Sequence, residues 1–255
     1  MGLPDLTMAE AKKLAAGPFG ATLLRAAGSY AVPICWPKSI DERGGIRLTN
    51  GTAFFVKTPS AVFGVTAAHV VRGFLADRAR DPRTECALLD SETKLDLERD
   101  LISIGTDADI ATFRVSDSVI SRLNKQPITG WPPRMPNVGR GILYEGFPGA
   151  VRESRGEREF SFGLCSGGGL ADAVEETEIV TSIDRPSLVD PLGNGLPPED
   201  FDFGGMSGGP VLAVFETGVL SWCLAGVITR SVDLLGGILC AARADCIADG
   251  GAVQR

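Results

Sequence analysis

Short apolar runs separated by turn-forming residues dominate the chain from Tyr30 onward. In the first half these runs are rich in β-branched and aromatic residues and are bounded by Gly, Pro, Asp and Ser, a pattern typical of strands. We expect strands at Tyr30–Trp36, Ile46–Val56, Ala61–Thr66, Glu85–Leu89, Lys94–Ile104 and Ile110–Val115. These strands are enough to close one small antiparallel barrel over residues 29–125.

A proline-rich segment then interrupts the strand pattern. Residues 126–136 contain Pro127, Pro132, Pro133 and Pro136. Because proline removes a backbone donor and fixes φ, this segment can form neither a helix nor a central strand. We therefore predict a linker between two domains.

Beyond the linker, the strand pattern resumes over residues 137–255. Strands are expected at Gly141–Phe147, Glu159–Leu164, Glu178–Ile183, Pro210–Phe215, Val219–Thr229 and Gly237–Ala242. The whole pattern predicts an all-β fold of two six-stranded antiparallel β-barrels packed face to face.

Residues 1–28 differ from the rest and predict a helical extension. Met8–Ala16 has a helical pattern that stops near Gly17-Pro18, and we expect this helix to pack on the outside of the first barrel. The segment lacks the basic start and unbroken apolar run of a secretory signal. No segment reaches about eighteen consecutive apolar residues, so no membrane span is expected. These features predict a cytoplasmic protein without a membrane partner.

The net charge and the cysteine spacing argue against two classes of function, nucleic-acid binding and metal binding. The net charge of −7 argues against nucleic acid as a partner, because such binding normally needs a basic face. None of the six cysteines belongs to a CxxC pair, so a metal site has little support. We expect mostly reduced thiols, several of them buried as small apolar side chains.

The stretch from Phe203 to Pro210 has the composition of a catalytic turn. It reads Phe-Gly-Gly-Met-Ser-Gly-Gly-Pro, so four glycines surround Ser207. Such a turn presents the hydroxyl without crowding, and its N–H groups can converge on an anion. A nucleophilic serine beside an oxyanion hole needs both features. Gly-rich turns also separate ordinary strands, so the stretch alone leaves both interpretations open.

Two residues upstream complete a candidate triad. His69, the only histidine, follows Thr66-Ala67-Ala68, and Asp109 precedes Ile110-Ala111. The pattern around Ser207 also fits the nucleophile elbow of α/β-hydrolases, but that fold needs a histidine after the serine, and none follows. The order His, Asp, Ser is instead that of the chymotrypsin arrangement.

These blocks carry a family resemblance. The residues Thr66–His69, Asp109–Ala111 and Gly205–Pro210 resemble the three signature blocks of the trypsin-like (chymotrypsin-fold) serine peptidases. Residues 51–56 resemble the strand before the histidine block in bacterial members, which more often carry Gly where Ala53 stands.

The resemblance implies a serine endopeptidase that acts on a protein or peptide substrate in the cleft between the barrels. Ser207 would be the nucleophile, His69 the general base and Asp109 the orienting acid, without metal or organic cofactor. The N–H groups of Gly205 and Ser207 would form the oxyanion hole.

The resemblance also implies a set of substrate-binding positions. These are Phe201, Asp202, Thr229, Arg230, Ser231 and Gly237. Asp202 would select a basic side chain, Phe201 would plug the pocket, and Arg230 would favour acidic or neutral groups. Because these indications conflict, the sequence predicts no side-chain preference.

Three alternatives stay open on the sequence. Asp107 competes with Asp109 for the triad; Asp109 is preferred because Ile110-Ala111 follows it, and Asp107 is predicted to cap the turn. Met206 stands where zymogen-activated relatives have Asp, so we expect a site that is either assembled constitutively or controlled by a regulatory protein partner. The rival function is a catalytically silent, protease-like module that acts through protein–protein contacts.

Overall fold

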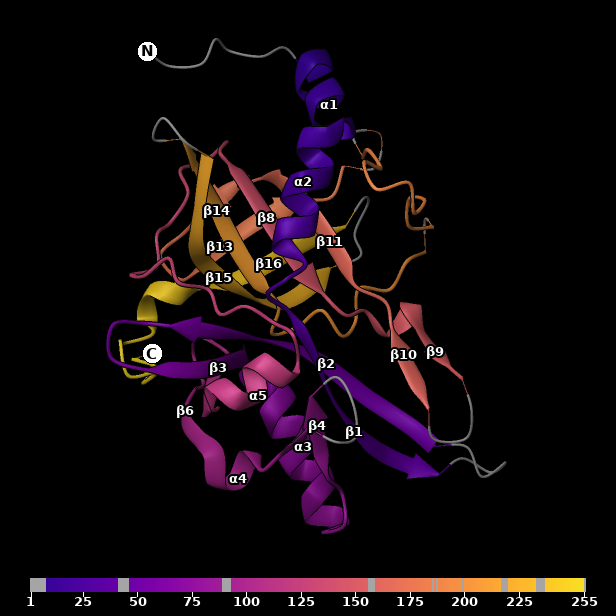
Figure 1. The fold of residues 1–255 in the computed structure, drawn as a ribbon, viewed down its shortest axis with the longest axis vertical. Coiled ribbons are helices and arrows are strands. Elements are labelled where there is room, and N and C mark those ends of the chain that lie inside the picture. Colours follow the sequence, from indigo (N-terminus) through magenta and orange to yellow (C-terminus); the bar gives the residue numbers. More distant parts are fainter. Residues whose placement is uncertain are drawn as a thin grey trace.

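Two curled antiparallel sheets of seven strands each form the body of the protein (Figure 1). This computed structural model describes residues 8–40, 46–88, 93–155, 159–184, 186, 188–198, 200–216, 220–232 and 237–254. In spatial order, the first sheet contains β5 (Lys94–Leu95), β4 (Cys86–Leu88), β1 (Val32–Ile40), β2 (Ile46–Lys57), β3 (Val62–Ala67), β7 (Ile110–Arg114) and β6 (Leu101–Gly105). The second contains β11 (Cys165–Leu170), β8 (Gly141–Gly146), β14 (Pro210–Glu216), β15 (Leu220–Val232), β16 (Ile238–Arg243), β13 (Glu178–Ser182) and β12 (Ala173–Val174). The expected double β-barrel architecture is confirmed.

The number of strands per sheet differs from the expected six. The run Lys94–Ile104 forms two strands rather than one, because the short helix α4 (Leu97–Asp100) interrupts it. Asp96 caps the start of this helix, since its side chain accepts a hydrogen bond from the Arg99 N–H. In the second half, β10 (Phe160–Phe162) pairs only with β9 (Arg152–Ser154) and forms a separate hairpin. The edge position of the sheet belongs to β11, a glycine-rich run that strand propensity disfavours.

The N-terminal extension contains two helices rather than one. The predicted helix is confirmed as α1 (Met8–Ala16), but α2 (Pro18–Ala27) follows at once. Pro18 begins α2 because a proline in the first helical turn leaves no hydrogen bond unmade. The expected position of α1 on the first barrel was wrong: α1 packs on α2, which in turn contacts β8 and β11 of the second sheet (Figure 1).

Alternating faces of β2 join the two sheets into one core. Ala53 and Phe55 point into the first sheet's own core, whereas Phe54 and Val56 belong to a cluster shared with β14 and β15. Successive side chains of a strand point to opposite faces, so a strand buried on both faces is apolar throughout. A third cluster, which includes Met206 and Ile228, fills the second sheet. The turn that carries Ser207 is therefore anchored in that core through Met206.

Two further α-helices follow in the first half of the chain, α3 (Ala68–Arg80) and α5 (Asp117–Arg122), and the second half contains the single 3₁₀ turns Gly149–Val151 and Ala244–Cys246. No helix in the described part of the chain combines the length and apolar character that crossing a membrane requires. Four cysteines are buried, as expected for small apolar side chains: Cys35, Cys86, Cys240 and Cys246.

Candidate active site

The pairing of β3 with β7 brings His69 next to Asp109. Ala67, the last residue of β3, lies opposite Ile110, the first residue of β7, and α3 starts immediately after Ala67. The Asp109 carbonyl accepts from the Ala68 N–H at 2.9 Å. His69 Nδ1 lies 2.6 Å from Asp109 Oδ2, and the His69 backbone N–H donates to Oδ1 at 2.8 Å. The carboxylate therefore holds the histidine by both its ring and its backbone.

Asp109, and not Asp107, is the acid that contacts the imidazole. Asp109 has φ +50°, a left-handed conformation that Asp tolerates better than most residues. This turn directs its carboxylate toward His69. Asp107 is exposed, and among the described residues its side chain accepts only from the Thr106 hydroxyl, at 3.4 Å. Of the two acids, Asp109 is therefore the one placed to orient the imidazole.

The Ser207 turn is held in place from the first sheet by Thr52 of β2. The Thr52 N–H donates to the Ser207 carbonyl at 2.8 Å, and its hydroxyl donates to the Gly205 carbonyl at 2.8 Å. The same hydroxyl accepts from the Phe147 N–H at 2.9 Å. One threonine therefore ties the turn, β2 and the end of β8 together.

Two glycines in this turn have conformations that other residues rarely adopt. Gly208 has φ +92°, and a Cβ there would lie 2.0 Å from the Thr52 carbonyl oxygen. Gly205 has φ +104°, and a Cβ there would lie 2.7 Å from both the Asn50 amide nitrogen and the Phe147 carbonyl oxygen. The turn can approach the first sheet only because both positions lack a side chain.

Two backbone donors of the turn remain available. The Met206 N–H donates to the Phe203 carbonyl at 3.1 Å. The N–H groups of Gly205 and Ser207, on either side of it, donate no hydrogen bond to any residue in the described ranges. These are the two donors that the resemblance assigns to an oxyanion hole.

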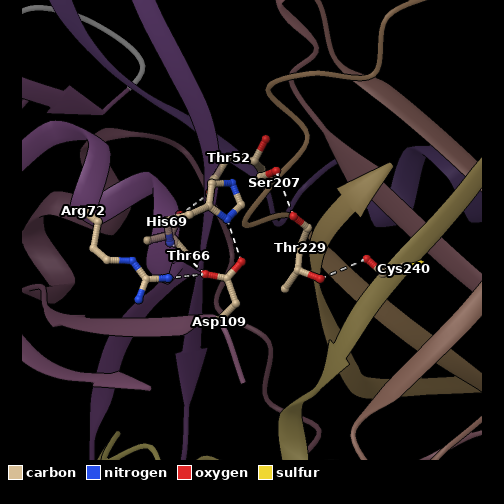
Figure 2. A network of polar contacts seen from close by, with 8 residues as sticks. All are labelled: Thr52, Thr66, His69, Arg72, Asp109, Ser207, Thr229 and Cys240. Carbon is tan, nitrogen blue, oxygen red and sulfur yellow. Dashed lines mark hydrogen bonds and ion pairs between the residues drawn. The ribbon is translucent and has the colours of Figure 1, made fainter. Parts of the chain in front are cut away.

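The Ser207 hydroxyl faces two possible acceptors. It donates to the Thr229 carbonyl at 3.4 Å, and among the described residues it makes no hydrogen bond to His69. The pairing of β15 with β16 shifts register between Ile228 and Arg230, so Thr229 is the extra residue of a bulge. In Figure 2 the imidazole lies between the Asp109 carboxylate and Ser207. The order of the three groups is that of a triad, with the serine bonded to Thr229 in this state.

The predicted substrate-binding positions fall into two groups. Phe201 is buried with its ring against Phe203, at 4.9 Å between centroids, and the exposed Asp202 accepts from the Gly204 N–H at 2.7 Å. On the other side, Arg230 pairs with both carboxylate oxygens of Glu178, at 2.9 and 3.2 Å.

The other three predicted positions lie on β15 or directly before β16. Thr229 donates its hydroxyl to the Cys240 carbonyl at 3.4 Å, and Ser231 is exposed. Gly237 is buried with φ +83°, and its carbonyl accepts from the Ile183 N–H at 2.8 Å. None of these side chains is hydrogen-bonded to Ser207.

Sequence reasoning missed two residues of this site. Thr52 lies in the segment 51–56 that resembles a family strand, but the partners of its hydroxyl, Gly205 and Phe147, are far away in the sequence, so no local pattern indicates these contacts. Arg72 Nη2 donates to Asp109 Oδ1 at 3.0 Å. Its spacing of three residues from His69 on a helix places both on one face, and that signal could have identified it.

A buried carboxyl group lies on β8, two residues before Phe147. Glu145 is only 1% exposed; its Oε1 accepts from the Ala31 N–H at 2.9 Å, and its Oε2 has no partner in the described part of the chain. Burial raises the pKa of Glu145 from its ordinary 4.5 to about 8, against the opposing effects of the Ala31 N–H and Lys125. The group is therefore largely neutral near pH 7.

Across the described residues, no group of three or more His, Cys, Asp or Glu side chains is arranged to hold a metal ion. No protein-family profile and no curated protein sequence matches this chain.

Several solved structures resemble the chain at low sequence identity. A thermostable serine protease from an extremophilic microorganism is 14% identical with a TM-score of 0.43, over 86% of this chain and 93% of that one. The serine protease domain of the Sesbania mosaic virus polyprotein is 15% identical with a TM-score of 0.43, over 83% and 87%. A Glu endopeptidase is 12% identical with a TM-score of 0.45, over 83% and 84%. These neighbours are serine proteases of chymotrypsin-like fold.

Proposed function

We propose that this protein is a serine endopeptidase of the trypsin-like class, with Ser207 as nucleophile, His69 as general base and Asp109 as orienting acid. The observation that carries the proposal is the double contact between His69 and the Asp109 carboxylate, beside a serine turn with two available N–H donors. A carboxylate bonded to Nδ1 keeps the proton there and leaves Nε2 as a base.

Acylation follows from this arrangement. Ser207 Oγ attacks the peptide carbonyl carbon while its proton passes to His69 Nε2. The imidazolium then gives that proton to the departing amine as the C–N bond breaks, which leaves an ester on Ser207. A water molecule repeats the sequence, releasing the acid and restoring the hydroxyl. No atom or electron is needed from outside the substrate and water.

The backbone supplies the charge stabilisation. As the carbonyl becomes tetrahedral, its oxygen gains negative charge, which the N–H groups of Gly205 and Ser207 would bind. Removing one such donor from a serine protease typically costs about 2.7–4 kcal/mol of barrier. The positive φ of Gly205 and the Thr52 bond to its carbonyl support this orientation.

The serine hydroxyl must change partner during the reaction. Its contact with the Thr229 carbonyl is long, at 3.4 Å, and a hydrogen bond of that length is weak. Rotation about the Ser207 Cα–Cβ bond would exchange this acceptor for His69 Nε2. Catalytic hydrogen bonds are often loose without substrate and tighten in the complex.

A fluorophosphonate probe tests the proposal, because it forms a covalent bond only with an activated serine. We expect wild-type protein to label and to hydrolyse unfolded casein, and Ser207→Ala to do neither while keeping its melting temperature. Ser221→Ala, at an exposed serine of β15, is the matched control and should behave as wild type.

Two results would contradict the proposal. Labelling that persists in Ser207→Ala would move the nucleophile elsewhere. A folded wild-type protein that neither labels nor hydrolyses would instead favour the catalytically silent binding module.

A further inference from the structure

Arg72 contacts the same carboxylate that holds His69. It lies on α3, three residues after the histidine, and its Nη2 donates to Asp109 Oδ1 at 3.0 Å. Oδ1 also accepts the His69 backbone N–H, whereas Oδ2 is bonded to the ring at Nδ1. Figure 2 shows Arg72 and His69 approaching the carboxylate from different directions. The Asp109 carboxylate therefore has three partners: the backbone N–H of His69, the imidazole of His69, and the guanidinium of Arg72.

Among the described residues, no side chain of the second sheet donates a hydrogen bond to this carboxylate. Thr229 of β15 lies on the same side of the site in Figure 2, but its hydroxyl donates to the Cys240 carbonyl at 3.4 Å. The hydrogen bonds that the described residues make to the Asp109 carboxylate all come from α3. The orientation of the Asp109 carboxylate thus depends on α3, and Arg72 is the one cation of that helix that contacts this carboxylate.

We propose that Arg72 is a positioning residue of the triad, acting through Asp109 on the proton affinity of His69. The expected effect on activity rests on the proposed function, whereas the expected effect on the protonation of His69 does not. The guanidinium fixes the rotation of the carboxylate about its Cβ–Cγ bond, which keeps Oδ2 on Nδ1. Its charge also offsets part of the Asp109 charge, so the imidazole accepts a proton less readily than it would beside an unpaired carboxylate.

The charged groups around the imidazole determine in which direction the protonation of His69 changes when Arg72 is replaced. Among the described residues, the charged groups in ion-pair contact here are Asp109, from the turn before β7, which pairs with His69, and Arg72, from α3, which pairs with Asp109; Figure 2 shows the neutral Ser207 on the other side of the ring. Removing the cation leaves the anion unopposed and favours the imidazolium. A general base must be unprotonated, so the acidic limb of the activity profile should move to higher pH.

The exposure of the pair limits the size of this effect. The side chains of Arg72 and Asp109 are 45% and 26% exposed, so solvent screens their charges. We therefore expect a shift of roughly 0.5–1 pH unit, and little change in stability.

The single histidine makes the experiment direct. The imidazole C2–H signal of His69 is titrated by NMR without substrate in wild type, Arg72→Gln, Arg72→Ala, Arg72→Lys and Arg80→Gln. Arg80 is the matched control, since it lies on the same helix and pairs with Asp77 instead. We expect the midpoint to rise by roughly 0.5–1 unit in Arg72→Gln and Arg72→Ala, and by less than half of that in Arg72→Lys, which keeps the charge. Arg80→Gln should leave it unchanged.

The result separates this inference from the proposed function. An identical midpoint in Arg72→Gln, Arg72→Ala and Arg80→Gln would overturn the positioning role, whatever the activity of the protein. If the wild type fails to label with fluorophosphonate but the midpoint shifts, the proposed function falls and the electrostatic coupling stands. If the protein is active, the acidic limb of kcat/KM should move in parallel with the NMR midpoint; a fixed limb would show that Arg72 does not act on the catalytic base.

Discussion

At the scale of single residues, Asp109 combines an unusual backbone with an unusually full set of contacts. Its φ of +50° places the carboxylate beside the first turn of α3, where the His69 N–H, the imidazole and Arg72 converge on it. A left-handed Asp is uncommon and is retained where surrounding contacts fix it. The backbone carbonyl of Asp109 adds a further bond, to the Ala68 N–H.

Replacing this acid tests its role against that of its neighbour. Asp109→Asn should lower kcat by about 10⁴-fold, because an amide that donates to Nδ1 favours the wrong imidazole tautomer. Asp107→Asn should change kcat only modestly, since among the described residues its side chain accepts a hydrogen bond from Thr106 and none from His69. Steady-state hydrolysis of one peptide substrate by both variants decides the matter. The opposite ranking would assign the triad acid to Asp107.

The three candidate triad residues could be identified from the sequence, whereas the residues that hold them in place could not. Ser207, His69 and Asp109 are restricted by chemistry to few residue types in a fixed order, and each lies in a short recognisable block. Arg72 and Thr52 act through contacts that depend on how α3 and β2 are placed. An exposed arginine on a helix and a threonine in a strand are common, so neither stands out until the fold is known.

At the scale of secondary-structure elements, the turn that carries Ser207 is shaped by three strands. β2 holds its carbonyls through Thr52, β15 exchanges hydrogen bonds with Gly208 and Gly209, and the end of β8 contacts Gly205. The Gly208 N–H donates to the Ile228 carbonyl at 2.7 Å and the Ile228 N–H donates to the Gly209 carbonyl at 2.8 Å. The conformation of the turn is thus a property of the assembled elements.

Substituting Thr52 tests this dependence. Thr52→Val keeps the shape of the side chain but leaves the Gly205 carbonyl and the Phe147 N–H without their partner, at a cost of about 1–3 kcal/mol for each unsatisfied group. We expect kcat to fall roughly 10- to 100-fold as the oxyanion donors lose alignment. Thr52→Ser, which retains the hydroxyl, is the control and should stay within a few-fold of wild type. Equal kcat values in the two variants would show that the hydroxyl does not position the turn.

Strand positions were predictable where apolar residues alternate or continue, and least predictable where glycine or a local cap intervenes. Ile46–Val56 was expected, and β2 extends one residue further, to Lys57. The Gly-rich β11 has no apolar pattern, and its pairing with β8 is a tertiary effect. In the same way, Gly17-Pro18 indicates a helix end and a helix start equally well from the local sequence.

At the scale of the whole molecule, Glu145 lies where the N-terminal segment meets the second sheet. It accepts from the Ala31 N–H, and Lys125, whose pKa is lowered by burial, is the nearby cation. Because the folded protein holds a proton on Glu145 up to about pH 8 and the unfolded chain releases it near 4.5, unfolding releases a proton between these values. Stability therefore falls as pH rises across this window and levels off above it.

Glu145→Gln should remove this pH dependence. The amide never ionises, so we expect the variant to match wild type near pH 5 and to exceed it by roughly 2–4 kcal/mol at pH 9. Urea unfolding at both pH values measures the difference. Glu153→Gln, at an exposed position of β9, is the control and should follow wild type throughout. A constant difference between Glu145→Gln and wild type across the range would show that Glu145 is ionised in the folded protein.

The Thr52 contact also has a consequence in time. Thr52 and Gly205 are 153 residues apart, and the first of them is synthesised together with the segments that carry His69 and Asp109. While the chain is still growing, the histidine–carboxylate pair can form. The turn that carries Ser207 has at that stage not been synthesised and cannot yet pack against Thr52 of β2. The proposed peptidase would become competent only as its last strands emerge and dock. A growing chain of the proposed peptidase would therefore carry no complete active site until the second sheet has folded against the first.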